Sequence, residues 1–190
     1  MKLFQPLKPF RINQKFGENR ACVDLATNSV YITCDGTNPP QGFKSVYGDL
    51  GHLGLDLAAY RGQPVYAAAA GTVSSIDTNP RTGLDVRIIT ESNGKKYLHW
   101  YEHLQGHNVK VGQWVKLGDV IGWADNTGYS SGDHLHLQLM VEVAGAWTPI
   151  DPLVHMESMC ALDAKGIFSR MLEQLAVLSE KLAELARQRS

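Results

Sequence analysis

Residues 127–139 read Thr-Gly-Tyr-Ser-Ser-Gly-Asp-His-Leu-His-Leu-Gln-Leu. From residue 134 onward, apolar side chains recur at every second position, and this period of two predicts a β-strand rather than a helix. Side chains two residues apart on a strand point to the same face, so we expect the imidazoles of His134 and His136 to face one space. Such a pair suits a metal ligand beside a catalytic base. Two ordinary hydrogen-bonded histidines on a half-buried strand would give the same pattern.

A second stretch, Gly51-His52-Leu53-Gly54-Leu55-Asp56-Leu57, holds a histidine and a carboxylate four residues apart. Its two glycines disfavour a helix, and an extended path would place His52 and Asp56 on one face. A neutral imidazole and a carboxylate are suitable ligands for first-row metals, and Zn(II) accepts such mixed sets. The alternative from the residues alone is a surface histidine and an aspartate bonded to nearby backbone groups.

Strand and turn signals dominate the middle of the chain. Asn93-Gly94 separates two β-rich runs, 86–90 and 96–101, and is typical of a tight hairpin. Residues 109–122 are short alternating runs separated by glycine-centred turns. Together these signals predict an antiparallel all-β domain with tight connections.

Residues 61–73 include four consecutive alanines, which favour a helix on propensity alone. Pro64, Gly71 and the β-branched residues beside them favour two short strands joined by a turn, and we expect strands. Residues 1–47 are rich in Pro, Gly and Asn, which predicts an irregular N-terminal segment with short strands, packing on the domain.

Composition excludes several classes of protein. With 190 residues, 44% apolar and 19% charged, the chain is expected to be a soluble globular protein with a sizeable core. A net charge of −1 offers no general attraction to nucleic acid. No apolar run approaches the roughly 20 residues of a membrane span, and the first nine residues lack the features of a secretory signal. We therefore expect neither a nucleic-acid partner nor a membrane span.

The three cysteines, Cys22, Cys34 and Cys160, form no Cys-x-x-Cys metal pair. Cys22 and Cys34 can bridge in an oxidising compartment, whereas an odd total without an export signal favours free thiols. Both readings stay open.

Five motifs occur in an order that resembles a known family. They are Gly-His-x-Gly-x-Asp at 51–56, Gly-x-Pro-Val-x-Ala at 62–67, Tyr-x-His-Leu at 101–104, Val-x-x-Gly-x-x-Val-x-x-Gly-x-x-Ile-Gly at 109–122 and Thr-Gly-x-Ser-x-Gly-x-His-Leu-His at 127–136. Together they resemble the zinc metallopeptidases of the lysostaphin and LytM type, which are peptidoglycan endopeptidases. The resemblance covers about residues 48–153 and implies an antiparallel β domain with an open groove.

The resemblance also implies roles for individual residues. It makes His52, Asp56 and His136 the ligands of one Zn(II) per chain, with water in the fourth, open position that marks catalytic zinc sites. His103 and His134 match the two catalytic histidines that do not bind the metal. One would accept the proton of the water, and the other would hydrogen-bond the developing oxyanion or protonate the leaving amine. Which histidine does which stays open.

Some positions are less certain or depart from the family pattern. Tyr47 loosely matches a family tyrosine and is a candidate extra oxyanion donor. Asp133 stands where the family commonly has proline, and Leu137-Gln138 replaces an aromatic residue and an acid. All five polar positions of the site are filled, which favours an active enzyme. The remaining histidines are expected to be ordinary and solvent-facing: His99, His107 and His155.

The sequence divides into a segment at 1–47, a metallopeptidase domain at 48–155 and an amphipathic helix at 156–190. Within the helix, apolar residues between 164 and 185 follow the 4,3 spacing of a heptad seam. Such a helix can fold back on its own domain, form a homo-oligomer or dock on a partner protein.

We expect a zinc endopeptidase that hydrolyses the stem or cross-bridge of bacterial peptidoglycan, acting at the cell wall outside the cytoplasm. Without a visible signal, delivery by a phage is expected, either as an endolysin or on the virion. One alternative is a structural or regulatory assembly module with a vestigial site, which oligomerises through its helix. Another is an enzyme whose substrate is a protein or peptide that is not part of the cell wall.

Overall fold

The computed structural model describes residues 1–18, 21–24, 29–33 and 51–156, with side chains outside 21–33. Several predictions fall outside these residues. They concern Tyr47, the helix beyond residue 156 with its seam, and the thiols of Cys34 and Cys160. The cysteine pairing, the role of the helix and the domain boundaries therefore stay predictions.

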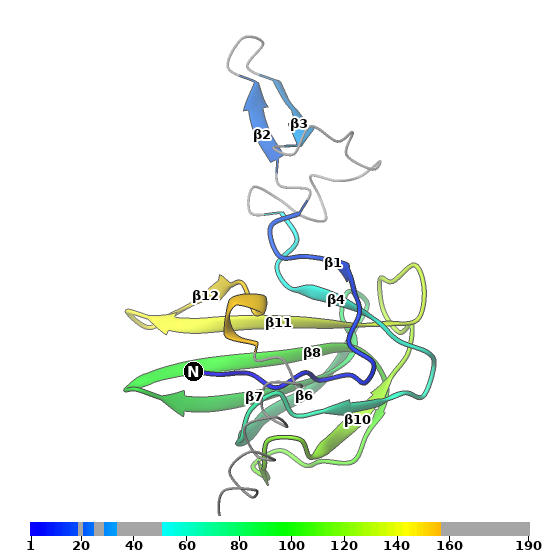
Figure 1. Ribbon diagram of the computed structural model, residues 1–190, viewed down its shortest axis with the longest axis vertical. Helices are drawn as coiled ribbons and strands as arrows, with labels where there is room; N and C mark the ends of the chain where they lie inside the picture. The colour runs from blue at the N-terminus through cyan, green and yellow to red at the C-terminus, as the bar shows by residue number, and fades with distance from the viewer. Residues whose placement is uncertain (19–20, 25–28, 34–50, 157–190) are drawn as a thin grey trace, which may run out of the picture. The chain divides into compact units, whose positions relative to one another are not determined.

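Antiparallel strands make up most of the described chain (Figure 1). The main sheet runs in the order β1-β4-β11-β8-β7-β6-β9, with β12 beside β11 and β10 beside β5 and β8; β2 and β3 pair separately. The bounds are β1 (Ile12–Gln14), β2 (Ala21–Asp24), β3 (Ser29–Thr33), β4 (Leu55–Ala58), β5 (Pro64–Tyr66), β6 (Gly71–Asn79), β7 (Gly83–Ser92), β8 (Lys95–His107), β9 (Trp114–Val115), β10 (Val120–Ala124), β11 (His134–Val143) and β12 (Ala146–Ile150). The predicted antiparallel all-β fold is confirmed.

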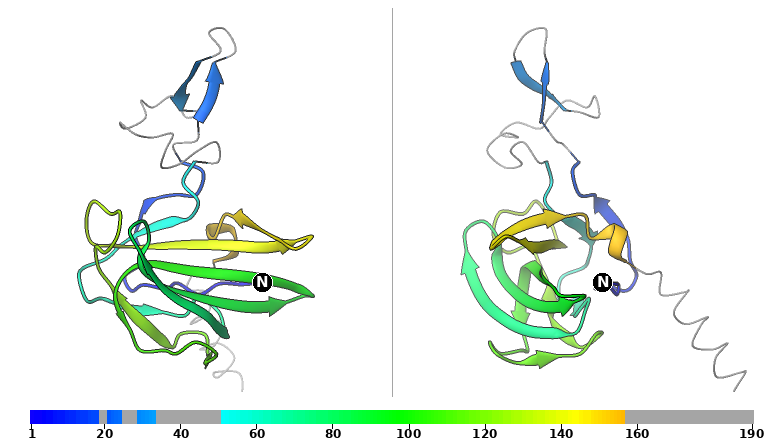
Figure 2. Two further views of the ribbon diagram at one scale, coloured as in Figure 1. Left: turned by 180° about the vertical axis from the view of Figure 1, so that it is seen from behind. Right: turned by 90° about the vertical axis from the view of Figure 1, so that its left-hand side faces the viewer.

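The main sheet is strongly curved, as the two views of Figure 2 show. The first part of β8 pairs with β11 on one side and β7 on the other, and its last residues pair with β10. This leaves β4, β11 and β8 as neighbours. No helix in the described ranges has the length and hydrophobicity to cross a membrane.

Alternation along β11 separates the core from the opposite face. Leu135, Leu137 and Leu139 are at most 1% exposed, while His134 and His136 lie on the other face with part of their surface accessible. Full burial of one such leucine stabilises the fold by about 2 kcal/mol. The period of two read from the sequence therefore fixes which face of β11 carries the histidines.

The alanine-rich stretch forms a tight connection between β5 and β6, as expected. Ala67, Ala68 and Ala69 are at most 5% exposed. Their small side chains allow the N-terminal segment to approach, and the Phe4 amide donates a hydrogen bond to the Ala68 carbonyl at 2.7 Å. Leu3, from the same segment, is 1% exposed in the core.

The prediction that His99 faces solvent is wrong, because the side chain is fully buried. It lies on β8, paired with Leu139 on β11 and Ile88 on β7, so the strand is enclosed on both edges. Burial, helped by the positive charge of His155, lowers the pKa of His99 to about 3. The imidazole is therefore neutral in the folded protein at physiological pH.

Candidate metal centre and active site

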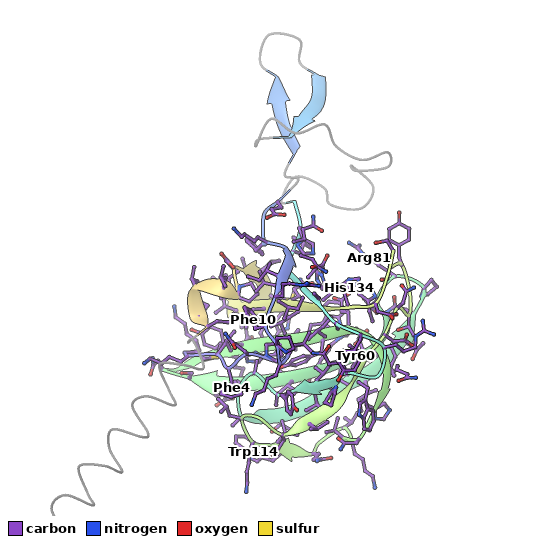
Figure 3. The ribbon with its side chains drawn as sticks, turned by 45° about the vertical axis from the view of Figure 1, so that its right-hand side comes forward. Phe4, Phe10, Tyr60, Arg81, Trp114 and His134 are labelled. Atoms are coloured by element: carbon purple, nitrogen blue, oxygen red, sulfur yellow. The ribbon has the colours of Figure 1, made fainter. Side chains whose placement is uncertain are left out.

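A groove of about 700 Å³ opens over β4, β11 and β8. Asp56 on β4 pairs with His136 on β11, which pairs in turn with Glu102 on β8, and all three line the groove. His52 and His103 line it as well. His134 begins β11 and is labelled in Figure 3. The structure therefore brings together all five predicted site residues that it describes.

The three predicted ligands form a compact triangle. Asp56 Oδ1 lies 2.8 Å from His136 Nδ1 and 3.2 Å from His52 Nε2, and the two nitrogens are 3.1 Å apart. Zinc bonds of about 2.0–2.1 Å place tetrahedral ligand atoms about 3.4 Å apart. The triangle is close in size to one face of a tetrahedral zinc site, and its donor atoms are ones that Zn(II) accepts.

Hydrogen bonding to the backbone fixes the orientation of His52. Its Nδ1 lies 3.0 Å from the Lys15 carbonyl oxygen. A carbonyl only accepts hydrogen bonds, so Nδ1 carries the proton and Nε2 carries the lone pair. Nε2 is the atom that faces Asp56 and His136. His52 therefore has the tautomer that a metal ligand requires.

Neighbouring groups keep the ligands in forms that bind a metal. Burial alone would raise the pKa of Asp56, but the hydrogen bonds with His136 and His52 outweigh it and hold this pKa well below its usual range. Burial lowers the pKa of His136, against the opposing effect of Asp56. An ionised carboxylate and a deprotonated imidazole nitrogen are the species that coordinate metals.

A β-bulge directs His103 toward the groove. Two steps along β7, from Leu84 to Val86, correspond to three steps along β8. The backbone of His103 has a φ of 62°, which is unusual for a residue with a side chain. Because of the extra residue, consecutive side chains at Glu102 and His103 both line the groove.

The Thr-Gly pair at 127–128 holds His103 in place. His103 Nδ1 donates to the Thr127 carbonyl at 2.7 Å, and Thr127 Oγ1 donates to the Leu104 carbonyl at 2.9 Å. Gly128 and Gly83 both have positive φ and pack so closely that a side chain on either would collide with the other segment. Burial lowers the pKa of His103 to about 4, so its Nε2 carries a lone pair at neutral pH.

His134 is held in a similar way. Its Nδ1 donates to the Gly132 carbonyl at 2.8 Å. Its Nε2 lies 3.6 Å from Asp56 Oδ1, and its ring centroid is 4.7 Å from that of His103. Both histidines thus use Nδ1 for the backbone and leave Nε2 to exchange protons beside the ligand triangle.

Sequence reasoning missed Glu102. Simple alternation along residues 101–104 would place Glu102 and His103 on opposite faces, and nothing in the sequence marks the bulge that brings them together. Glu102 is only 7% exposed. Burial, with the negative charge of Asp85 adding to it, raises the pKa of Glu102 to about 8.

Comparison with known proteins gives matches over this domain. The model of peptidase family M23 matches residues 50–152. Lysostaphin of Staphylococcus simulans is 37% identical over 107 residues, which are 56% of this chain and 22% of that protein. Peptidoglycan DD-endopeptidase ShyA of Vibrio cholerae is 40% identical over 90 residues, 47% of this chain and 20% of ShyA. The aligned region thus spans about a fifth of each relative.

Solved structures share the fold. The catalytic domain of lysostaphin from Staphylococcus simulans has a TM-score of 0.56 and 29% identity, covering 76% of this chain and 90% of that one. A zinc containing peptidase from Vibrio cholerae has a TM-score of 0.58 and 28% identity, covering 80% of this chain and 39% of that one. The predicted family resemblance, fold class and zinc cofactor are confirmed. The chain belongs to peptidase family M23.

Proposed function

We propose that this chain is a zinc-dependent endopeptidase that hydrolyses peptide bonds in the stem or cross-bridge of bacterial peptidoglycan. The observation that carries the proposal is the triangle of His52, Asp56 and His136, with His103 and His134 beside it. Relatives named as a lysostaphin and as peptidoglycan DD-endopeptidases support the substrate class. The alternative, an assembly module with a vestigial site, is not favoured, because all five histidine and aspartate side chains of the site are present.

The proposed chemistry divides between the ligand triangle and the two other histidines. When bound, zinc supplies a Lewis acid that activates water and polarises the peptide carbonyl. Nε2 of one histidine, His103 or His134, accepts the proton of the attacking water. Nε2 of the other, when protonated, donates to the oxyanion or to the leaving amine. The carbonyls of Thr127 and Gly132 keep both rings oriented for these transfers.

The lining of the groove offers further contacts for a peptide beside the ligand triangle. Beyond the ligand triangle, its floor continues through Trp100 and Gln138, which are paired across β8 and β11, to Met140. Tyr129, on the rim, is 69% exposed. Aromatic and apolar surface beside a few convergent polar groups is the usual lining of a ligand-binding site.

The test uses purified sacculi of several peptidoglycan types, with turbidity and released amines as readouts and zinc content measured for every sample. We expect His103→Ala and His134→Ala to keep one zinc per chain and to lose about 10²–10⁴-fold in rate, the usual contribution of general acid–base catalysis. His107→Ala is the matched control, because His107 is exposed and outside the groove. No release from any sacculus by the zinc-loaded wild type would contradict the proposed substrate.

The site of action, the route of delivery and the oligomeric state are further proposals that come from the sequence alone. They are action at the bacterial cell wall, delivery as a phage endolysin or virion-associated lysin, and oligomerisation through residues 164–185. Probing purified virions and infected-cell lysates with an antibody tests the delivery. Sedimentation of the full chain tests the oligomerisation.

A further inference from the structure

Four polar side chains form a row across the neighbouring strands β1, β4, β11 and β8. Gln14 pairs with Asp56, Asp56 with His136, and His136 with Glu102. All four residues line the groove. Side chains directly opposite each other on antiparallel strands are close enough to interact. His136 therefore has a carboxyl group on each side.

The two sides of the His136 ring are held unequally. Nδ1 lies 2.8 Å from Asp56 Oδ1 in the ligand triangle. Nε2 makes no hydrogen bond within the described residues, and it faces Glu102 Oε1 at 4.0 Å. For His52, the nitrogen that points away from the triangle is already held by Lys15. An imidazole held only at its metal-binding nitrogen can rotate, and rotation moves that nitrogen off the metal.

Glu102 lies where its carboxyl group can bind the Nε2 side of the His136 ring. Its side chain is only 9% exposed, and its carboxyl makes no hydrogen bond in the described part of the chain. A movement of about 1 Å brings Oε1 within the usual N–H···O distance of Nε2. Gly54 leaves the space beside the ring open, because a Cβ there would lie 2.7 Å from His136 Nε2.

We propose that Glu102 accepts a hydrogen bond from the Nε2–H of His136 and so positions this ligand for zinc. The inference rests on the metal site of the proposed function. A histidine ligand that donates its outer N–H to a carboxyl or carbonyl oxygen is fixed in tautomer and orientation, and loss of such a partner typically costs 10–100-fold in metal affinity. Glu102 acts through His136, so it is a positioning residue rather than a catalytic one.

The experiment compares Glu102→Met and Glu102→Gln in the full chain. Methionine matches the length of glutamate but offers only a weak sulfur acceptor, and glutamine keeps an acceptor oxygen. Gln138→Met is the matched control, since Gln138 is 5% exposed and lies on the same face of β11, two residues beyond His136. The readouts are zinc affinity by competition with a chromogenic chelator, the visible spectrum of the Co(II)-substituted protein, and the melting temperature of the metal-free protein.

We expect Glu102→Met to bind zinc about 10–100-fold more weakly, with an altered Co(II) spectrum and a melting temperature close to that of the metal-free wild type. Glu102→Gln should recover most of the affinity, and Gln138→Met should keep it. Unchanged affinity in Glu102→Met, or equal losses in the Met and Gln variants, would overturn the positioning role while leaving the proposed function intact. A wild type that binds no zinc would overturn both.

Discussion

Gly54 is glycine because of the histidine beside it. A Cβ at this position would lie 2.7 Å from His136 Nε2 and 2.5 Å from the Leu137 carbonyl oxygen. Both distances are shorter than a carbon atom tolerates, and the carbonyl belongs to a central strand that cannot easily move. The second glycine of the 51–56 motif therefore serves the geometry of the metal site rather than a turn.

Gly54→Ala tests this reading. The added methyl group should displace the His136 ring, and we expect zinc affinity to fall at least about tenfold, the loss typical of a misplaced ligand. Chelator competition measures the affinity. Gly106→Ala is the control, because a Cβ at Gly106 would make only an ordinary contact at 3.8 Å with Trp123. Equal zinc affinity in both variants would show that the ring tolerates the methyl group.

The pairs His134–His136 and His52–Asp56, and the strands that carry most of them, follow from local patterns, whereas His103 was singled out only by the family resemblance. Alternation in 134–139 correctly placed both histidines on one face of β11, and the Gly-containing 51–56 motif brought His52 to Asp56. The structure brings the predicted ligands together, while their roles stay predictions. Glu102 was missed and His99 was misjudged for one reason. The burial of His99 and the direction of the Glu102 side chain both depend on which strands pair with β8. Pairing between strands far apart in the sequence leaves no local signal.

β8 is anchored to the rest of the domain by Tyr101, which directly precedes the bulge. Its side chain is fully buried, and its hydroxyl oxygen accepts a hydrogen bond from the Ala68 amide at 2.8 Å. The tyrosine of the Tyr-x-His-Leu motif thus links the active-site strand to the connection between β5 and β6.

Tyr101→Phe should remove this link without changing the shape of the core. The Ala68 amide would lose its partner in a buried place, and we expect the free energy of unfolding to fall by about 1–3 kcal/mol. Urea unfolding of the zinc-free protein measures the change. The matched control is Tyr60→Phe, which makes the same change at an exposed side chain. It should leave the free energy of unfolding within about 0.5 kcal/mol of the wild-type value, because Tyr60 is 63% exposed. A fall of the same size in Tyr60→Phe would contradict the buried-amide explanation.

At the level of the whole domain, His99 makes stability depend on pH. Its pKa is about 3 in the folded protein and near its ordinary value of 6.5 when unfolded. Between these values the unfolded chain binds a proton that the folded one does not, so the free energy of unfolding falls as pH decreases. One such group contributes a slope of up to about 1.4 kcal/mol per pH unit.

His99→Leu should reduce this slope. In the described part of the chain neither ring nitrogen of His99 has a hydrogen-bond partner, so an apolar replacement loses no bond there. Unfolding free energies of the zinc-free wild type and variant, measured from pH 7 to pH 5, should diverge as the solution is acidified, with the variant the more stable. The exposed His107→Leu serves as control. Parallel curves for His99→Leu and the wild type would exclude His99 as the source.

The close contact between Gly128 and Gly83 has a consequence for how new specificities can arise. Thr127 and Gly128 fix one end of the loop that leads to β11, and the pairing of His134 with Ala58 fixes the other. Of the residues between them, Tyr129, Ser130 and Ser131 line the groove. Exchanges of the exposed Tyr129 and Ser131 can reshape the entrance, while Thr127 keeps its hold on His103 and Gly132 its hold on His134. The fold thereby offers two positions open to evolutionary or laboratory diversification beside machinery that has to stay unchanged.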